Sequence, residues 1–355
     1  MHSDLRLSLN NELKMGLFSF LTKEIAIDLG TANTVIYCND KLVVDEPSII
    51  ALDLTTGKIK AVGKRAQQMH GKTHDNYIRT IRPLRDGVIA DFRSAESMLR
   101  EFIKKIPGIK SLGMSSLKVV ICIPSGITEV EERAVKDSAE QAGAKEVKLI
   151  HEPMAAAIGI GIDVLEPIGN MVVDIGGGTS EIAVISLGNI VVSQSIRVAG
   201  DEFNKDIMEH MKKHHNINVG ERTAEFIKIE VGAALPKLDN PPPDVKIQGR
   251  DMMTGIPKEV TVNYSEIAEC LNESISRIEQ EIVLALEKTP PELSSDIFRT
   301  GIYLAGGGAL LCGLDKRLQE RTQLQVHIAE DPLRAVARGT QIALKNFDKF
   351  TFLIK

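Results

Sequence analysis

The strongest constraint on the fold is a short pattern that occurs twice in the chain. An apolar segment runs into an aspartate and a glycine turn at Asp28-Leu-Gly-Thr-Ala-Asn-Thr34, and again at Asp174-Ile-Gly-Gly-Gly-Thr-Ser180. A short apolar return strand follows each turn, at residues 34–37 and 182–185. Internal repetition of this kind indicates a duplicated architecture. We therefore predict two similar α/β domains whose turns open toward one shared cleft.

The composition agrees with this architecture. A chain of 355 residues is too long for one hydrophobic core. Aromatic residues make up only 4% of it, so Ile, Val, Leu and Ala must fill the interior, as in buried parallel sheets. The net charge of −5 argues against a nucleic-acid partner. The four cysteines are far apart and predict neither a disulfide framework nor a zinc knuckle, and no apolar run is long enough to span a bilayer. These features favour a reducing cytosol.

The two glycine turns have the chemistry of a phosphate site. Gly30 and Gly176–Gly178 lack side chains that would block approach, so backbone N–H groups can reach phosphate oxygens. The carboxylates of Asp28 and Asp174 would repel a phosphate, so we expect them to hold a cation or its waters. Mg²⁺ fits, because it keeps several waters and combines one or two carboxylates with substrate phosphates. The turns also carry the hydroxyl groups of Thr31, Thr34, Thr179 and Ser180.

A glutamate lies between the two turns, at the start of a predicted helix of small residues. Glu152 precedes Pro153, which suits a first helical turn, in the run from Glu152 to Gly159. A carboxylate there can orient water for in-line attack on a γ-phosphate. The alternative is that Glu152 only stabilises the helix N-terminus, where acids are common. The facing phosphate turns favour the catalytic interpretation.

The remaining patterns complete an α/β order. A third strand at 302–305 meets a glycine turn at 306–308, and 118–123 is a continuous apolar strand. A small β structure is expected within 245–262. Helical spacing predicts helices over 95–106, 129–142, 201–214, 222–235 and 265–286, and from about residue 314.

In this order the motifs resemble those of the actin-like ATPases, a group that includes actin, sugar kinases, heat-shock chaperone ATPases and bacterial shape proteins. Residues 28–34 and 174–180 are similar to the two phosphate motifs, and Pro124-Ser-Gly126 with its helix to the first connecting segment. Ala305-Gly-Gly-Gly-Ala-Leu310 resembles the adenosine motif. Arg82-Pro-Leu-Arg-Asp-Gly-Val-Ile-Ala-Asp91 and the run from Glu152 to Gly159 resemble the MreB family of bacterial actins. The resemblance extends from about residue 15 to the C-terminus.

The resemblance implies an α/β, actin-like ATPase fold: two duplicated RNase H-like domains, each with a smaller subdomain, and a nucleotide cleft between them. The first domain would cover 24–154 with an insertion at about 46–90. The second would cover 155–330 with an insertion at about 202–260, and a C-terminal helix in 331–355 would return to the first domain. The implied ligands are ATP, with GTP as an alternative left open, and Mg²⁺.

The resemblance also implies roles for single residues. Glu152 would position the hydrolytic water with help from Asp174 and Thr179. Glu225 and Lys228, one helical turn apart on one helix face, would embrace the adenine and ribose. Mg²⁺ would be held through water by Asp28 and Asp174. Further implied nucleotide contacts are Gly30, Thr31, Ala32, Asn33, Gly176, Gly177, Gly178, Gly200, Gly306, Gly307, Gly308, Ala309 and Leu310.

Four further positions bear on this assignment. Gly200 and Asp201 resemble the family's glycine-aspartate turn beside the nucleotide. His151 stands where many family members carry a second acid, and Asn204 where an aspartate is usual. Neither departure removes a residue assigned to chemistry, but His151 would alter the hydrolysis rate by changing the local charge.

Two apolar segments predict contact with a membrane. On a helical wheel, the apolar side chains of residues 15–23 share one arc, namely Leu17, Phe18, Phe20 and Leu21. Such a segment can lie in a membrane interface; the alternative is that it staples the first strand into its domain. A loop that resembles the family's membrane loop adds Ile109, Leu112, Met114 and Leu117. Residues 1–14 match nothing in the family, and Met15 is an alternative start.

The implied function is that of a structural ATPase, which forms filaments at the inner face of the cytoplasmic membrane and directs cell-wall synthesis to maintain rod shape. The implied partners are further copies of the chain, paired laterally through the helix containing Val130, and membrane morphogenesis proteins of the elongation machinery. The alternative is a small-molecule kinase of the same superfamily, which needs a catalytic aspartate for a sugar hydroxyl. A chaperone ATPase would need a substrate-binding domain after the C-terminal helix, where this sequence ends.

Two further patterns are weak. Gly71-Lys-Thr73 has the end of a P-loop, but Ala66 stands where its first glycine is required. His210 and His214 have the i,i+4 spacing of zinc ligands, but the pattern lacks the glutamate of HExxH and a third ligand. We therefore expect a solvated polar face around these histidines.

Overall fold

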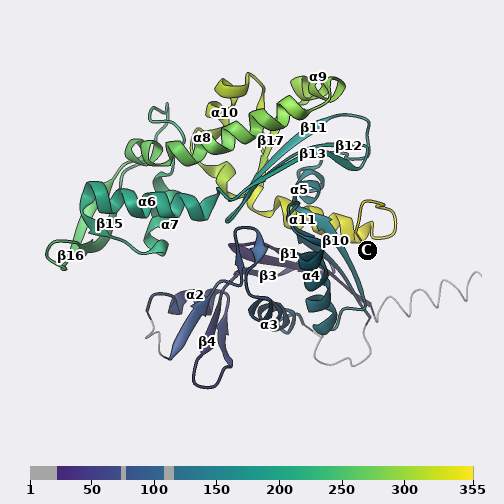
Figure 1. The fold of residues 1–355 in the computed structure, drawn as a ribbon, viewed down its shortest axis with the longest axis horizontal. Coiled ribbons are helices and arrows are strands. Elements are labelled where there is room, and N and C mark those ends of the chain that lie inside the picture. Colours follow the sequence, from purple (N-terminus) through teal and green to yellow (C-terminus); the bar gives the residue numbers. More distant parts are fainter. Residues whose placement is uncertain (1–21, 73–76, 108–115, 355) are drawn as a thin grey trace, which may run out of the picture.

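The computed structural model describes residues 22–72, 77–107 and 116–354, which form two α/β halves on either side of a cleft (Figure 1). None of the helices in these ranges is long and apolar enough to cross a membrane. The side chains predicted to contact a membrane, Leu17, Phe18, Phe20, Leu21, Leu112 and Met114, lie outside the described residues. The strand β1 begins at Thr22, so the end of the predicted amphipathic segment is a strand that pairs with residues 116 and 117.

A five-stranded mixed sheet forms the core of the first half, in the order β10-β9-β1-β2-β3. β1 (Thr22–Leu29) pairs antiparallel with β2 (Asn33–Cys38), which pairs antiparallel with β3 (Lys41–Pro47). β9 (Ser116–Ile123) runs parallel to β1, and β10 (Glu146–His151) runs parallel to β9. Parallel central strands are buried on both faces, which explains their continuous apolar runs.

The second half repeats this topology strand for strand, in the order β18-β17-β11-β12-β13. β11 (Asn170–Ile175) pairs antiparallel with β12 (Ser180–Ser186) and parallel with β17 (Ile302–Ala305). β13 (Asn189–Ile196) and β18 (Val326–Ile328) form the edges, as β3 and β10 do in the first half. The duplicated α/β architecture predicted from the two aspartate-led turns is confirmed.

Two helices, α5 (Glu152–Ile160) and α11 (Ala335–Lys345), form a layer between the two sheets (Figure 1). α11 packs on β1 and β9 of the first sheet, and α5 packs on β11 and β12 of the second. One continuous buried cluster joins both helices to Ala26 and Val120 on one side and to Val172 on the other. The two halves therefore share a core.

The two helices of this layer cross with their backbones in close contact. A Cβ atom added at Gly159 would lie 1.8 Å from the carbonyl oxygen of Ala335, and one added at Gly339 would lie 1.7 Å from that of Ala155. Any side chain at either glycine would collide with backbone atoms, which cannot rotate away. The crossing thus requires glycine on both helices.

The outer faces of the sheets are covered by helices with local start and stop signals. α3 (Phe92–Ile103) and α4 (Glu129–Gln141) belong to the first half, and α8 (Tyr264–Lys288), α9 (Pro291–Thr300) and α10 (Leu314–Thr322) to the second. α3 begins three residues before its predicted start and ends three residues before its predicted end. The early start arises because the Asp91 carboxylate accepts a hydrogen bond from the backbone of Ser94 and caps the helix there.

A smaller unit is inserted in the first half. β4 (Ile50–Asp53), β5 (Ile59–Val62) and β6 (Ile78–Ile81) form a three-stranded sheet, with α2 (Lys64–Met69) against it. The short hairpin of β7 and β8 follows at residues 84–89.

The insertion in the second half contains α6 (Gly200–His215), α7 (Glu221–Val231) and a sheet of β14 (Ile217–Asn218), β15 (Val245–Asp251) and β16 (Pro257–Val262). The prediction that α7 extends to residue 235 is wrong. Gly232 is extended and Ala233 forms a β-bridge with Cys312, so a partner far along the chain ends the helix.

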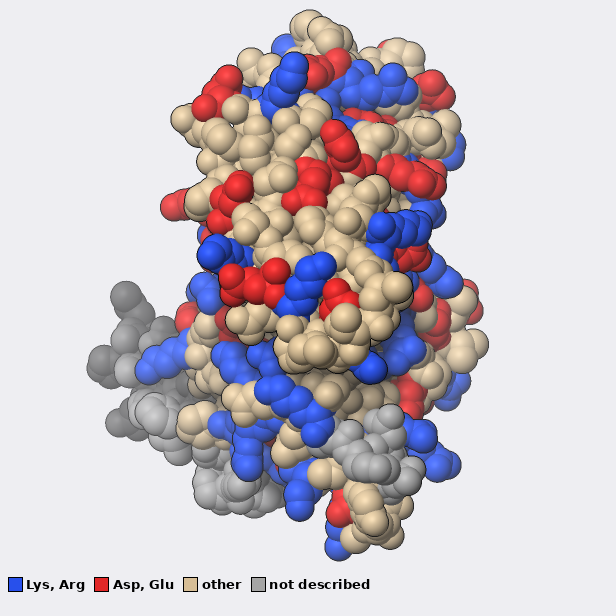
Figure 2. Space-filling model, turned by 90° about the vertical axis from the view of Figure 1, so that its left-hand side faces the viewer, with Lys and Arg blue, Asp and Glu red and all other residues tan. Residues whose placement is uncertain are grey.

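The two insertions differ in charge. Figure 2 shows Lys and Arg side chains predominating over the lower half of one face, whereas both signs mix over the upper half. In the described part of 46–90, three acids, Glu46, Asp53 and Asp86, stand against Lys58, Lys60, Lys64, Arg65, Lys72, Arg79, Arg82 and Arg85. The first insertion therefore presents positive charge, and the acidic partners of its Arg82 lie across the cleft.

Candidate functional site

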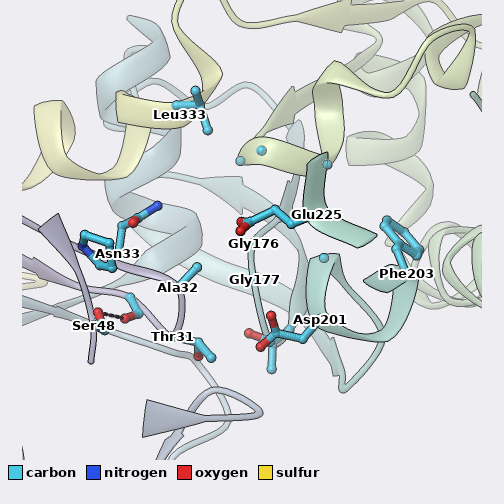
Figure 3. A pocket seen from close by; sticks show the side chains of 18 of the residues that line it. Thr31, Ala32, Asn33, Ser48, Gly176, Gly177, Asp201, Phe203, Glu225 and Leu333 are labelled. Carbon is cyan, nitrogen blue, oxygen red and sulfur yellow. Dashed lines mark hydrogen bonds between the residues drawn. The ribbon is translucent and has the colours of Figure 1, made fainter. Parts of the chain in front are cut away.

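A cavity of about 500 Å³ lies between the two halves, where the two aspartate-led turns face each other (Figure 3). Its walls come from the ends of β1 and β11, the glycine that follows β17, the first residues of α5 and α6, one side of α7, and the 3₁₀ helix η1 (Gly307–Leu310). Ligands of open α/β sheets bind beyond the carboxyl ends of the strands. The cavity has that position and the size of a small-molecule site.

All but one of the residues predicted to contact a nucleotide line this cavity. The exception is Ala309, which is fully buried. The predicted catalytic residues Glu152, Asp174 and Thr179 also line it. The other predicted residues in its walls are Asp28, Gly30, Thr31, Ala32, Asn33, Gly176, Gly177, Gly178, Gly200, Glu225, Lys228, Gly306, Gly307, Gly308 and Leu310.

The two turns approach each other closely because the second one is bare backbone. A Cβ atom added at Gly177 would lie 2.7 Å from the Cβ of Ala32, and one added at Gly178 would lie 2.9 Å from side-chain atoms of Thr31. Figure 3 shows Thr31 and Ala32 on one side of the cavity and Gly177 on the other. The glycines therefore serve two purposes: they let the halves close, and they leave N–H groups accessible to an anion.

Carboxyl groups gather at the base of the cavity. Burial raises the pKa of Asp28 to about 7. Burial, together with the charges of Asp28 and Glu181, raises the pKa of Asp174 to about 7. The pKa of Glu152 lies well above its usual value, because of burial first and then Glu181, Asp174 and Asp28. So many like charges in a buried place favour a bound cation.

The arrangement fits a divalent cation with oxygen ligands. The Oδ1 atom of Asp174 is buried and has no hydrogen-bond partner within the described ranges. Asp28 and Asp174 belong to no described set of three side chains whose ligand atoms all lie within 4.8 Å of one another. The protein thus offers carboxylates but no closed cage, and Mg²⁺ suits such a site because it retains waters and takes oxygens from a bound phosphate.

Glu181 is a buried acid that the sequence pattern did not single out. Its side chain accepts hydrogen bonds from the backbone N of Ser125 at 3.2 Å, from the Ser125 hydroxyl, and from Ser195 Oγ at 2.6 Å. Ser125 belongs to the first half and Glu181 to the second, so one carboxylate links the halves, and its charge helps to raise the pKa of Glu152. Glu181 directly follows the second turn, and this position is the sequence feature that could have identified it as a site residue.

The opposite end of the cavity is more apolar and lies against α7. Glu225 and Lys228 line it, and Lys228 Nζ donates a hydrogen bond to the carbonyl oxygen of Gly200 at 2.9 Å. Burial lowers the pKa of Lys228. Three apolar side chains, Ile229, Leu310 and Leu333, line this end although more than half of each is exposed to solvent. Ile229 and Leu333 were not predicted, because isolated surface aliphatic residues carry no sequence signal.

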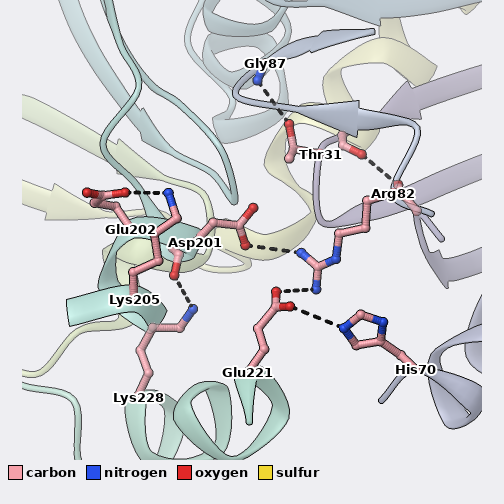
Figure 4. A network of polar contacts seen from close by, with 12 residues as sticks. Thr31, His70, Arg82, Gly87, Asp201, Glu202, Lys205, Glu221 and Lys228 are labelled. Carbon is pink, nitrogen blue, oxygen red and sulfur yellow. Dashed lines mark hydrogen bonds and ion pairs between the residues drawn. The ribbon is translucent and has the colours of Figure 1, made fainter. Parts of the chain in front are cut away.

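A network of charged side chains crosses the outer side of the cleft (Figure 4). Arg82 Nη2 lies 2.8 Å from Glu221 and Nη1 lies 3.3 Å from Asp201. His70 Nε2 lies 3.6 Å from Glu221. Arg82 and His70 come from the first insertion, and their acidic partners from the second. Partly exposed ion pairs contribute little each, so this network adds little to the stability of the contact between the halves.

Comparison with known proteins identifies close relatives. The family model described as MreB/Mbl protein matches residues 22–351. The chain is 49% identical over 328 residues to the cell shape-determining protein Mbl of Bacillus subtilis strain 168, covering 92% of this chain and 97% of that protein. It is 47% identical over 338 residues to the cell shape-determining protein MreB of Escherichia coli strain K12, covering 94% and 95%.

A solved structure agrees with these relatives. MreB5 of Spiroplasma citri bound to AMPPNP aligns with a TM-score of 0.87 at 40% identity, covering 92% of this chain and 97% of that one. Its ADP-bound form aligns with a TM-score of 0.86 at 40% identity, covering 92% and 99%.

Proposed function

The chain belongs to the MreB/Mbl family of actin-like, cell shape-determining proteins, and on this premise we propose that it is a filament-forming ATPase whose cleft binds ATP with Mg²⁺. Its relatives support a cytoskeletal ATPase and not the small-molecule kinase alternative. The observation that carries the proposal is the cavity itself, in which both aspartate-led turns and Glu152 face one space. MreB5, at 40% identity, binds AMPPNP and ADP.

The domain division is part of this proposal. We assign 24–154, with an insertion at about 46–90, to domain I, and 155–330, with an insertion at about 202–260, to domain II. The repeated strand order supports this boundary. The packing of α11 on β1 and β9 supports a return of residues 331–355 to domain I.

The phosphates would lie between the two turns. Backbone N–H groups of Gly30 and Gly176–Gly178 would donate to phosphate oxygens, with the hydroxyl groups of Thr31 and Thr179 beside them. Mg²⁺, when bound, would neutralise charge on the phosphates. Asp28 and Asp174 are the residues that would hold its waters, and this use accounts for two carboxyl groups that are otherwise buried at a cost.

Glu152 would orient the water that attacks the γ-phosphate and accept its proton. A carboxylate with a raised pKa is suited to act as a general base near neutral pH. The first residue of α5 is fixed by the packing of the helix between the sheets, so the carboxylate keeps one position while the halves move around it. Asp174 and Thr179 would assist from the second turn.

The nucleoside would occupy the apolar end of the cavity. Ile229, Leu310 and Leu333 offer aliphatic surface for the adenine ring, and Glu225 and Lys228 would bind the ribose and base edge. A guanine ring would meet the same surface, so the preference for ATP belongs to the proposal.

Nucleotide binding would couple the cleft to assembly. A ligand that touches both halves favours their closed arrangement, and hydrolysis would weaken it. A head-to-tail contact that does not close gives an open filament. Val130, on α4, is 76% exposed, and we place lateral pairing of two protofilaments at its helix.

Filaments would bind the inner face of the cytoplasmic membrane through residues 15–23 and the loop around residues 109–117. One such segment binds weakly, so many copies on a filament provide stable attachment. In this position the protein would act with membrane morphogenesis proteins of the elongation machinery.

Co-sedimentation tests the proposal. Full-length protein with ATP, Mg²⁺ and anionic liposomes should pellet as polymer with the liposomes. A chain beginning at residue 24, which keeps only the loop around residues 109–117, should form polymer but bind the liposomes more weakly. Neutral liposomes are the control for charge. If no polymer forms with any nucleotide, and ATP is consumed only when a sugar is added, the kinase alternative replaces this proposal.

A further inference from the structure

A second group of potential metal ligands lies outside the cleft. The Nε2 atom of His210 is 3.2 Å, and that of His215 is 2.6 Å, from the same Oε2 atom of Glu266. The ligand atoms of the three side chains all lie within 4.8 Å of one another, which holds for no other such set in the described residues. The prediction of a solvated face holds for His214, which is exposed, but not for His210, whose side chain is 13% exposed. The third partner, Glu266, comes from a helix 51 residues after His215.

The local structure fixes these three side chains. α6 ends at His215 because Asn216 adopts a left-handed conformation. Glu266 is the third residue of α8, and its other oxygen, Oε1, accepts a hydrogen bond from the backbone N of Asn263 at 2.7 Å. The capping box thus holds the carboxylate with Oε2 directed at the imidazoles. The side chains are 13%, 21% and 19% exposed, so the group is sheltered but open on one side.

We propose that His210, His215 and Glu266 form a Zn²⁺ site in the second insertion. Two imidazole nitrogens and one carboxylate oxygen are a common zinc ligand set, which leaves a fourth position for water or an incoming ligand. Imidazole favours zinc over magnesium. A carboxylate already oriented by a hydrogen bond has the outer contact that metal ligands usually show.

The charge state of the group agrees with this assignment. Burial lowers the pKa of His210, so its imidazole is neutral and has a lone pair for a metal. Hydrogen bonds from Asn263, His215 and His210 lower the pKa of Glu266 despite its partial burial, so it is a carboxylate. The competing arrangement is a metal-free one, in which both imidazoles donate hydrogen bonds to Oε2.

The proposed site is separate from the cleft. Gly200, at the other end of α6, lines the nucleotide cavity, and 15 residues of helix put about 22 Å between the two. The base of the cleft offers the carboxylates of Asp28 and Asp174, whereas this group offers two imidazole nitrogens. The last residue of α6 and the first turn of α8 enclose residues 216–263, so a zinc ion would join the two ends of that segment.

Zinc uptake by the full-length chain tests the proposal. Equilibrium dialysis against Zn²⁺, with excess Mg²⁺ to occupy oxygen sites, should give one Zn²⁺ per chain. His215→Ala should weaken binding by more than the roughly 10–100-fold that loss of an outer-shell contact costs. The matched control is His214→Ala: its exposed ring stacks on His210 with centroids 4.4 Å apart, but it is not in the ligand group, so binding should be unchanged.

Thermal unfolding separates a lost site from a lost fold. With a chelator present, wild type and His215→Ala should unfold within a few degrees of each other, and added Zn²⁺ should raise the Tm of wild type and His214→Ala but not that of His215→Ala. Asp174→Asn should bind Zn²⁺ as wild type does, which excludes the cleft. The proposal is overturned if wild type takes up no Zn²⁺, or if His214→Ala and His215→Ala respond alike.

Discussion

The two halves of the molecule repeat one sheet, yet only the first carries an acid where its inner helix begins. After β10, α5 starts with Glu152 in the cavity. After β18, α11 starts at Ala335 with no acid in its first turn. The turns differ as well, because the first has the side chains of Thr31 and Ala32 and the second has glycines at 176–178. Duplication accounts for the two facing turns. The differences between the two copies account for the single acid at the start of α5 and for the unequal side chains of the turns.

The glycines of the second turn are needed because little space separates the two turns. Two turns with side chains could not approach as these do, since a single Cβ atom at Gly177 already reaches Ala32. Where the turns come closest, the first therefore presents side chains and the second presents bare backbone. Substitutions that make the halves more alike should disturb the protein in proportion to how much each difference matters.

The largest effect should come from removing the acid of α5. Glu152→Gln gives both inner helices a neutral start and should slow ATP hydrolysis by roughly 10²–10⁴-fold, because the general base is lost, while ATP binding is kept. Phosphate release and fluorescent-nucleotide binding measure the two. Glu292→Gln, in the first turn of α9 away from the cavity, is the control. Loss of ATP binding in Glu152→Gln would mean that the residue is structural.

A pH titration should expose the burial of Asp174. Its pKa is 3.8 in the unfolded chain and about 7 in the folded one, so between those values the folded state holds a proton that the unfolded state does not. Stability therefore falls as the pH rises through this window, on the order of 4 kcal/mol for three pKa units at about 1.4 kcal/mol each.

Asp174→Asn removes this dependence. Without nucleotide and Mg²⁺, the free energy of unfolding of the variant should rise relative to wild type from pH 4 to pH 7, as measured by denaturant titration. Mg²⁺ with ATP should reduce the difference. A constant difference across the window would show that Asp174 is ionised throughout in the folded protein.

A smaller effect is expected where the two inner helices cross. Gly339→Ala places a Cβ atom against the backbone of Ala155 and should lower the free energy of unfolding by roughly 3 kcal/mol, after any gain in helix propensity. Gly220→Ala, which meets nothing within 4 Å, should cost at most about 1 kcal/mol. Equal effects of the two changes in chemical denaturation would argue against a tight crossing.

The smallest effect should follow from giving the second turn one methyl group. Gly177→Ala should weaken ATP binding by about 1–3 kcal/mol, since the turns must separate to admit it. Ala32→Gly in the same chain removes the opposing methyl group and should restore part of the affinity, which calorimetric titration of the single and double variants measures. If Ala32→Gly gives no rescue, the turns do not meet in solution.

Local patterns predicted much of this fold because its main features repeat. The aspartate-led turns, their flanking strands and the glycine turn at 306–308 are each contiguous in sequence. Because the aspartate-led turn occurs twice, each copy supports the structure predicted for the other. The early start of α3 depends on Asp91, an ordinary N-cap residue whose position in the sequence is consistent with a start at residue 92. Contacts between segments that lie far apart in the sequence could not be predicted from these local patterns.

Those distant contacts decide several functional details. Glu181 depends on Ser125 and Ser195, and α7 ends early because of Cys312. Glu266 completes a histidine group that had looked incomplete along α6. In each case one partner is an unremarkable serine, cysteine or glutamate whose role appears only when the fold brings it near.

The bare crossing of α5 and α11 has a mechanical consequence. Backbones in direct contact resist sliding, since a translation along either helix would bring residues that carry a Cβ atom against the backbone of the other. Rotation about the contact point meets far less resistance, so relative motion of the halves is reduced to a pivot. The two insertions lie far from this contact point. A small rotation at the crossing of the helices would therefore displace Arg82 and Glu221 by a larger distance. A neighbouring chain that holds those outer ends would therefore exert leverage on the cleft that a ligand near the pivot cannot.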